Sequence, residues 1–151
     1  MTRIGELCER DVVVAGPETT IEDVAKLMRA RHVGCVVVVD QQDAGLPLPQ
    51  GVVTDRDLVV EITALGLDPK VMAVSDIMTQ ELVTVQADAD PHQAMRLMRG
   101  KGLRRLPVVT ANGHLVGLIA FDDLLEFVTE ELSDLTRAVG HEQAREAAAR
   151  R

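Results

Sequence analysis

The sequence predicts a mixed α/β (α+β) fold in which one β-α-β-β-α unit occurs twice, the two copies packing with pseudo-two-fold symmetry. The first observation is an internal repeat, because residues 4–40 align with residues 74–110 at a shift of 70, which falls to 66 after the first hairpin. The second is the alternation of short β-branched segments with stretches of helical periodicity. The third is the segment Ala111-Asn112-Gly113, since Asn-Gly strongly favours a hairpin turn.

The first copy contains the full set of expected elements. These are a strand at 12–14, a helix after Thr19 or Thr20, hairpin strands at 36–39 and 51–53 around a loop at 41–50, and a helix at 55–65. Either threonine can cap the first helix, whose apolar face has the 3.6-residue spacing of Ile21, Val24, Leu27 and Met28. The nearly continuous apolar strands are expected to be buried on both faces.

The second copy repeats this order. Its expected elements are a strand at 82–85, a helix from Asp90 to Gly100 or Gly102, hairpin strands at 106–109 and 115–120, and a helix at 122–131. Asp90 caps the first helix and Pro91 occupies its first position, where a residue without an N–H is tolerated.

The repeat divides the chain into four segments. They are repeat 1 at 1–66, a linker at 67–75, repeat 2 at 76–131 and a helix-prone tail at 132–151. Gly140 is expected to interrupt the tail, and the last ten residues to form a solvated, partly frayed helix. Before Gly140 the tail fits either a solvated helix or a contact with another subunit or partner.

Composition excludes several classes of function. The net charge of −8 and the presence of only two aromatic residues, Phe121 and Phe127, argue against nucleic-acid binding and against an anionic membrane surface. The N-terminal residues lack a signal-peptide apolar region, and no run approaches the ~20 apolar residues of a membrane span. Cys8 and Cys35 have no metal-binding spacing, which favours a reducing cytoplasm and no metal site.

The turn at residues 51–57 is the most informative stretch for function. Thr54 is the expected N-cap of a helix that follows a strand directly, and Asp57 is its third residue. One interpretation is a capping box, worth ~1 kcal/mol. The other is a ligand site, in which the hydroxyl and the free N–H groups bind phosphate and the carboxylate binds ribose hydroxyls.

The second copy differs at the same turn. It keeps Gly117 and Asp123, but Ala120 replaces the hydroxyl, and Phe121 is either an aromatic neighbour of a ligand or part of the core. Just before the strand at 106–109 lie three cations, Lys101, Arg104 and Arg105, which form either an anion clamp or a solvated basic loop. A pseudo-two-fold axis would bring these cations toward the turn of the first copy.

The repeat order, the Gly-Val-Val-Thr-Asp-Arg-Asp turn at 51–57 and the Leu-Arg-Arg-Leu-Pro-Val-Val strand entry at 103–109 resemble paired cystathionine-β-synthase (CBS) repeats, a Bateman module. The resemblance covers residues 4–131. It implies a regulatory, non-catalytic module whose cleft holds up to two adenosine ligands, such as AMP, ADP, ATP, NAD or S-adenosylmethionine. It also implies a homodimer that passes the signal to its own interface or to a regulated protein.

The resemblance implies two unequal nucleotide sites. In the first, Thr54 binds phosphate, Asp57 binds ribose, and Arg104 and Arg105 bind the phosphates. The other residues expected there are Val52, Val53, Arg56, Thr79, Leu82, Val83, Leu103 and Pro107. The second site, which has neither the hydroxyl nor the arginines and should not bind phosphate, is expected to consist of Asp123, Ile119, Ala120, Leu7, Cys8, Val13, Val33 and Cys35.

Two other classes of function stay open from the residues themselves. The chain could be a ligand-free dimerisation or interaction scaffold whose turns are only helix caps. It could also be a small metal- or redox-responsive protein that uses Cys8 and Cys35. An enzyme is not expected, because there is neither a Ser-His-Asp order with a nucleophile elbow nor a P-loop lysine.

Overall fold

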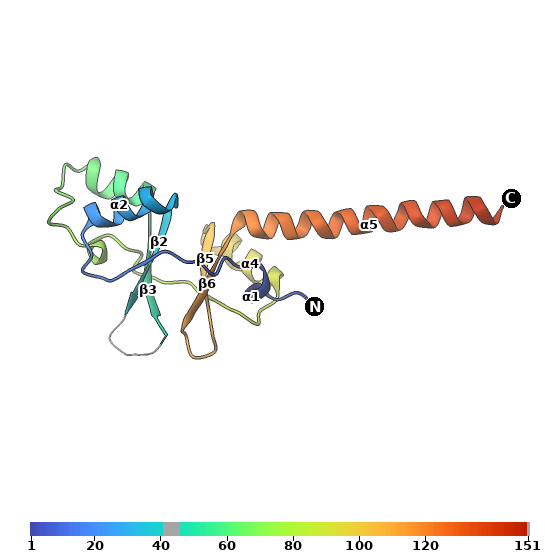
Figure 1. Ribbon diagram of the computed structural model, residues 1–151, viewed down its shortest axis with the longest axis horizontal. Coiled ribbons are helices and arrows are strands. Elements are labelled where there is room, and N and C mark those ends of the chain that lie inside the picture. The colour runs from blue at the N-terminus through green and yellow to red at the C-terminus, as the bar shows by residue number, and fades with distance from the viewer. Residues whose placement is uncertain (41–45, 151) are drawn as a thin grey trace.

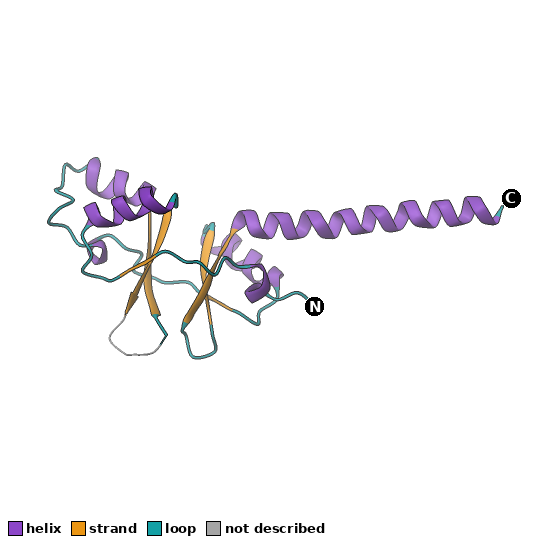
Figure 2. Cartoon of the chain, viewed as in Figure 1, coloured by secondary structure: helices purple, strands orange, loops and turns teal. Residues whose placement is uncertain are grey.

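The computed structural model describes residues 1–40 and 46–150, and contains two three-stranded sheets that lie side by side with helices against them (Figures 1 and 2). The first half contains α1 (Ile4–Leu7), β1 (Val14–Ala15), α2 (Ile21–Arg31), β2 (Cys35–Asp40), β3 (Leu48–Thr54), α3 (Asp55–Asp57) and the π-helix η1 (Leu58–Thr63). The second contains η2 (Val74–Asp76), a 3-10 helix, followed by β4 (Val85–Gln86), α4 (Pro91–Lys101), β5 (Arg105–Val109), β6 (Leu115–Ala120) and α5 (Phe121–Ala149). The predicted α+β class and the tandem repeat are therefore confirmed.

The two sheets have the same topology. In each, a short strand pairs in parallel with the first strand of an antiparallel hairpin, giving the orders β1-β2-β3 and β4-β5-β6. The two parallel strands, Val14–Ala15 and Val85–Gln86, begin two and three residues later than the sequence predicted. As expected, β2 is buried on both faces, while β6 alternates between buried and half-buried residues.

The predicted helix caps are present in both copies. The Thr20 hydroxyl accepts a hydrogen bond from the Asp23 N–H at 3.2 Å, so Thr20 rather than Thr19 caps α2. Asp90 accepts from the His92 N–H at 2.7 Å, with Pro91 at the first position of α4. The left-handed residue that ends the helix is Gly102 in α4 but His32 in α2, a conformation that costs a side-chain-bearing residue more than glycine.

The two repeats exchange the segments that complete their cores. Ile4 is fully buried in the second core, with the Ile4 N–H donating to the Ala89 carbonyl at 3.0 Å. Conversely, Val74 is fully buried in the first core, and its N–H donates to the Thr19 carbonyl at 2.8 Å. A third cluster, built from Val37, Val39 and Leu115, joins the two sheets. Each core therefore includes residues that lie outside the part of the chain expected to form it.

The first hairpin and the helix that follows it also differ from the sequence predictions. The first hairpin strand pair extends to Leu48, so residues 48–50 belong to β3 and not to a loop. Of the rest of the expected loop, residues 46–47 lie outside any strand and residues 41–45 lie outside the described residues. The helix after Asp57 is a π-helix, with the Ala64 N–H donating to the Val59 carbonyl. Four of its six residues are β-branched, which weakens the α-helical preference in this stretch.

The C-terminal helix is the largest departure from expectation. The sequence predicted an end at residue 131 and an interruption at Gly140, but α5 continues without a break from Phe121 to Ala149. A glycine in an exposed helix costs only about 1 kcal/mol, which the helix-favouring Glu, Ala and Arg residues around it offset. No helix within the described residues is both long and apolar enough to cross a membrane.

Candidate functional site

The turn after β3 forms a complete capping box. The Asp57 N–H donates to the Thr54 hydroxyl at 3.3 Å, and the Thr54 N–H donates to Oδ2 of Asp57 at 2.8 Å. The next N–H, of Asp55, donates to the Gly34 carbonyl at 3.0 Å and so ties the helix start to the entry of β2. Thr54 and Asp57 are both half-buried, which fixes their side chains while leaving them accessible from outside.

The equivalent turn of the second repeat keeps one half of this arrangement. The Ala120 N–H donates to Oδ2 of Asp123 at 2.7 Å, and the Phe121 N–H donates to the Arg104 carbonyl at 2.7 Å. No hydroxyl is available at position 120. In both repeats the aspartate carboxylate therefore accepts a hydrogen bond from the backbone N–H three residues earlier. Only the first repeat also has a hydroxyl at this turn, that of Thr54.

Residues of opposite repeats meet at the ends of β3 and β6. The N–H and the hydroxyl of Thr79 both donate to the Val52 carbonyl at 3.1 Å. On the pseudo-symmetric side, Glu9 and Leu118 exchange two backbone hydrogen bonds of 3.0 and 2.9 Å. Thr79 and Val52, both predicted for the first site, are thus brought together across the repeats.

Arg105 acts electrostatically on the first repeat. Burial raises the pKa of the Cys35 thiol to about 11, the Arg105 guanidinium lowers it, and the carboxylates of Asp57 and Asp55 raise it. Cys35 is also the register partner of Thr54 in the β2–β3 ladder. The capping-box carboxylate and the arginine of the other repeat therefore share one neighbourhood around this thiol.

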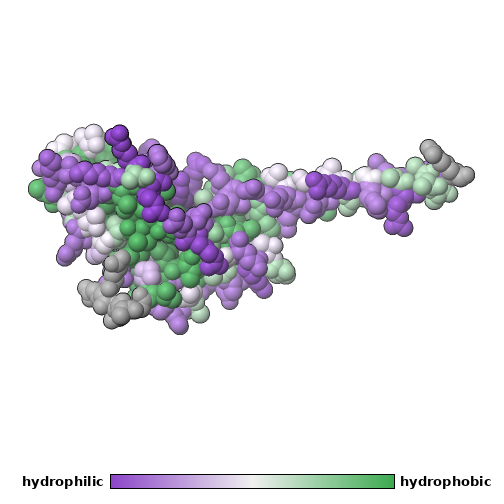
Figure 3. Space-filling view, in the orientation of Figure 1, coloured by the Kyte–Doolittle hydropathy of each residue, from purple (hydrophilic) through white to green (hydrophobic). Residues whose placement is uncertain are grey.

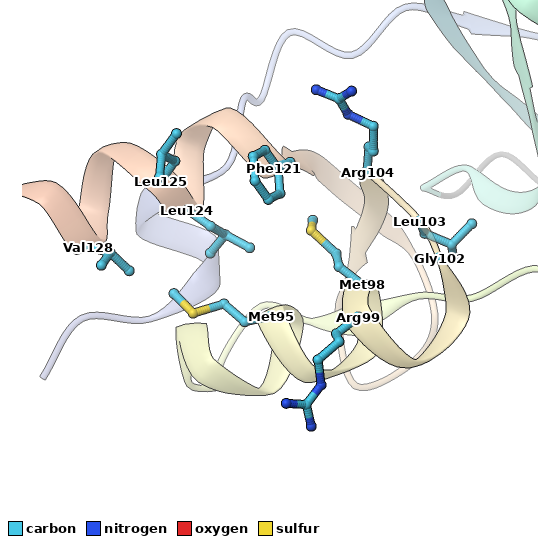
Figure 4. A pocket seen from close by; sticks show the side chains of 10 residues that line it. All are labelled: Met95, Met98, Arg99, Gly102, Leu103, Arg104, Phe121, Leu124, Leu125 and Val128. Atoms are coloured by element: carbon cyan, nitrogen blue, oxygen red, sulfur yellow. The ribbon is translucent and has the colours of Figure 1, made fainter.

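Arg104 has different surroundings. Its guanidinium lies 5.6 Å from the ring centre of Phe121, a cation–π arrangement that Figure 4 shows beside the start of α5. Phe121 is 46% exposed, so it is not core filling. Arg104 and Arg105 together line a cavity of about 290 Å³ with Ala120, Phe121 and Asp122, close to the lower end of ligand pockets at roughly 300 Å³.

Several predicted site residues are not accessible in this conformation. Val53 and Ile119 are fully buried, and Val13 and Pro107 are also buried. Their apolar side chains belong to the sheets and cores, and their contact with a ligand stays a prediction. The remaining first-site residues are exposed or half-buried: Arg56, Leu82, Val83 and Leu103, of which Val83 and Leu103 pack on the second core.

The second predicted site is only partly assembled as expected. Leu7 and Cys8 pack against the core that contains Ile119, and the Asp123 carboxylate acts on the Cys8 thiol. Val33 packs instead on the core of the first repeat. Cys35 is the register partner of Thr54 in the β2–β3 ladder, and its place in the second site stays a prediction.

Arg10 is a cation that the sequence prediction missed. Its guanidinium donates to the Gly5 carbonyl at 2.8 Å. Burial raises the pKa of the Cys8 thiol, and Arg10 partly opposes that rise, so its charge lies close to the second-site residues. The repeat alignment could have indicated it, because Arg10 aligns with Gln80 and this position carries a charge only in the first copy.

The thiols have the character of buried core groups. Both cysteines are free, and burial is the largest influence on the pKa of each, raising both above the ordinary value of 9.0. A thiol with a raised pKa is a poor nucleophile and metal ligand near neutral pH. Within residues 1–40 and 46–150, no three His, Cys, Asp or Glu side chains gather as a metal site would require.

Comparison with known sequences finds one family. The sequence model described as the CBS domain matches residues 4–64 and 74–130. A protein from Methanopyrus kandleri, MK0525, is 38% identical over 82% of this chain, although the match spans only 61% of that relative. YlbB of Bacillus subtilis is 34% identical over 95% of this chain and 97% of its own length.

Solved structures have the same architecture. A protein with CBS domains from Burkholderia ambifaria aligns with a TM-score of 0.73 at 28% identity, covering 84% of this chain and 93% of that one. CBSX2, solved in complex with AMP, aligns with a TM-score of 0.71 at 26% identity, covering 86% and 98%. A hexameric CBS-CP12 protein from bloom-forming cyanobacteria aligns at 0.71 and 29%, covering 83% and 70%.

Proposed function

The chain belongs to the CBS-domain family, and we propose that it is a regulatory module which binds an adenine nucleotide between its two repeats. The observation that carries the proposal is the shared neighbourhood of three groups: the Thr54 hydroxyl, the Asp57 carboxylate and the Arg105 guanidinium of the other repeat. A site with an anion-binding cation, a hydroxyl and a carboxylate suits a ligand that carries both phosphate and ribose. The AMP bound to CBSX2 supports the same ligand class.

Each group has a distinct task in this proposal. Arg105 and the Thr54 hydroxyl bind the phosphate, while Arg104 helps to close the phosphate end. Asp57 uses Oδ2 for the Thr54 N–H, so its other oxygen is the acceptor for ribose hydroxyls. Val52 and Thr79, which already touch across the repeats, flank the base. Ligand binding then stabilises one relative position of the two repeats.

The second site has a different ligand preference. Position 120 is an alanine and has no hydroxyl, although Arg104 and Arg105 line a cavity with Ala120 and Arg10 adds a further cation near Cys8. We therefore assign the phosphate-bearing ligand to the first site and at most a nucleoside-like ligand to the second.

The output of the module is self-association and contact with a regulated protein, not catalysis. Val59 and Leu125 occupy equivalent positions in the two repeats, and they are 59% and 54% exposed. Apolar side chains exposed at matching positions favour a symmetric homodimer. The multimeric CBS-CP12 neighbour supports assembly of this kind. The two free thiols are in keeping with a cytoplasmic protein.

The test is thermal unfolding of the purified chain with AMP, ADP, ATP, NAD and S-adenosylmethionine, and with GTP as control. Ligand at a hundredfold its dissociation constant stabilises by about 2.7 kcal/mol. Replacing Asp57 by Ala should weaken binding by about 10–100-fold, because a hydrogen-bonded carboxylate is lost.

A matched control is available elsewhere in the chain. Asp76 makes the same bond as Asp57, its Oδ2 accepting from the Ala73 N–H at 2.9 Å, but it lies outside the site. Asp76→Ala should therefore keep normal nucleotide affinity. Failure of every adenine compound to raise the melting temperature would contradict the proposal and leave the ligand-free scaffold.

A further inference from the structure

The second half of α5 leaves the folded body entirely. Residues 130–149, here called the arm, are all exposed, and Figures 1 and 3 show them extending away from the two sheets. Twenty helical residues span about 30 Å. A helix of this length with no tertiary contacts depends on propensity alone and is only marginally stable.

An apolar seam runs along α5 and into the arm. Six apolar side chains follow one another in steps of alternately four and three residues: Phe121, Leu125, Val128, Leu132, Leu135 and Val139. This is the heptad spacing of helices that pair as coiled coils. Leu132, Leu135 and Val139 are each more than half exposed, so this part of the seam has no cover within the chain.

The seam begins in a groove of the folded body. Phe121, Leu125 and Val128 line a cavity of about 730 Å³ between α4 and α5, together with Met95 and Met98 (Figure 4). Arg99 and Arg104 also line it and make this part of the surface basic. The groove and the arm are therefore two parts of one continuous apolar strip.

We propose that the arm of a second copy of this chain lies antiparallel in this groove, and that the groove of the second copy receives the arm of the first. In one register every seam residue of the arm meets an apolar partner. Leu132 faces Leu135 of the partner subunit, and Val128 faces the partner's Val139. The same pairs recur by two-fold symmetry, so the contact closes on itself as a dimer.

The charges select the antiparallel direction. The two seam positions after Val139 are Glu142 and Glu146. In the antiparallel register Glu142 reaches Leu125 of the partner subunit, and Glu146 reaches the partner's Phe121, over which an arginine lies. In a parallel pair each glutamate would face the same glutamate of the other subunit, and like charges repel. The 3.9 Å ion pair of Glu146 with Arg150 is exposed and weak, so it can exchange for the new contact.

This inference deepens the self-association in the proposed function and does not depend on nucleotide binding. Its test is the mass of the full chain by sedimentation equilibrium over a wide concentration range. Leu135→Lys should raise the dimer dissociation constant about tenfold or more, because an apolar seam contact is replaced by a charge. Ser133→Lys, which adds the same charge off the seam, should leave it unchanged. Helicity and melting temperature check that both variants fold.

Cysteine cross-linking tests the direction. In the antiparallel register Val128→Cys alone and Val139→Cys alone do not form cross-linked dimers, whereas the double variant does. The wild-type chain, with Cys8 and Cys35, is the oxidation control. Cross-linking of the single variants would show a parallel pair and overturn the groove contact.

Two further outcomes separate this inference from the rest of the proposed function. A stable dimer that Leu135→Lys leaves intact would overturn the arm contact but leave self-association through Val59 and Leu125 standing. A wild-type chain that is monomeric throughout would overturn both, and the nucleotide melting shifts would still report on the ligand site independently.

Discussion

The two repeats use the same backbone bond at the strand-to-helix turn but surround it differently. Asp57 and Asp123 each accept a hydrogen bond from the N–H three residues earlier, at 2.8 and 2.7 Å. Only the first turn adds a hydroxyl, from Thr54. The fold explains the carboxylate in both turns as a helix cap, and the first turn differs from the second by the Thr54 hydroxyl, which accepts a hydrogen bond from the Asp57 N–H.

A second comparison concerns the glycines in β3 and β6. Gly51 and Gly117 align in the repeat, and each lies against a residue of the other half of the chain. A methyl group at Gly117 would overlap the Cys8 sulfur and come within 2.9 Å of the Glu9 carbonyl. At Gly51 its three nearest neighbours would be atoms of the Met78 side chain, with Sδ at 2.8 Å. Gly117 therefore lies against rigid backbone at Glu9, whereas Gly51 lies against the flexible side chain of Met78.

The largest effect expected from this comparison is on stability. Gly117→Ala should cost about 3 kcal/mol, because the backbone of residue 9 is held by two hydrogen bonds and cannot move away. Gly51→Ala should cost about 1 kcal/mol, since methionine can change rotamer. Chemical denaturation of the two variants measures the difference, and equal losses would show that both crossings are equally rigid.

The next effect tests the surroundings of Cys35. Because its pKa rises from 9.0 to about 11 on folding, the folded form holds the proton more tightly than the unfolded form. The stabilisation is complete below pH 9 and is lost as the pH rises to about 11, by roughly 2–3 kcal/mol. Denaturation from pH 8 to 11 should show this loss in the wild type and a smaller one in Cys35→Val. Identical pH profiles would contradict the burial argument.

The smallest effect sharpens the comparison of the two turns. Ala120→Thr installs the missing hydroxyl in the second repeat and should stabilise the chain by about 1 kcal/mol as a helix cap. Thr54→Val should destabilise it by a similar amount. If the Thr54 hydroxyl also binds phosphate, Thr54→Val lowers nucleotide affinity, whereas Ala120→Thr leaves the first site unchanged. Calorimetric titration with AMP distinguishes the two roles.

Local signals in the sequence predicted most of the fold. The repeat, the Asp90 cap and the Thr54–Asp57 box follow from residue types at fixed spacing, and the structure has each of them. The first helix was expected to be capped by Thr19 or Thr20, and the structure selects Thr20. The extension of β3 to Leu48 was missed because Pro49 argues against a strand, although an edge strand tolerates it. The continuation of α5 was missed because glycine was given too much weight in a helix-favouring stretch.

The site was harder to predict because it depends on contacts between distant segments. The capping box is local, but the proximity of Arg105 to Cys35 and the position of Arg10 near Cys8 follow only from how the two repeats pack. The depth of Val53 and Ile119 likewise depends on which face of each sheet the helices cover. The repeat alignment shows which residues are equivalent, but the exposure of each side chain depends on how the cores pack.

The exchange of end segments between the repeats sets an order for folding during synthesis. Ile4 and Leu7 are synthesised before the core against which they pack, because that core is completed only by Leu124. The first repeat can close once Val74 and Met78 have emerged, while the N-terminal segment must wait with its apolar side chains uncovered. The core of the second repeat is therefore completed by a segment synthesised much earlier, in one late step that joins residues distant in the sequence.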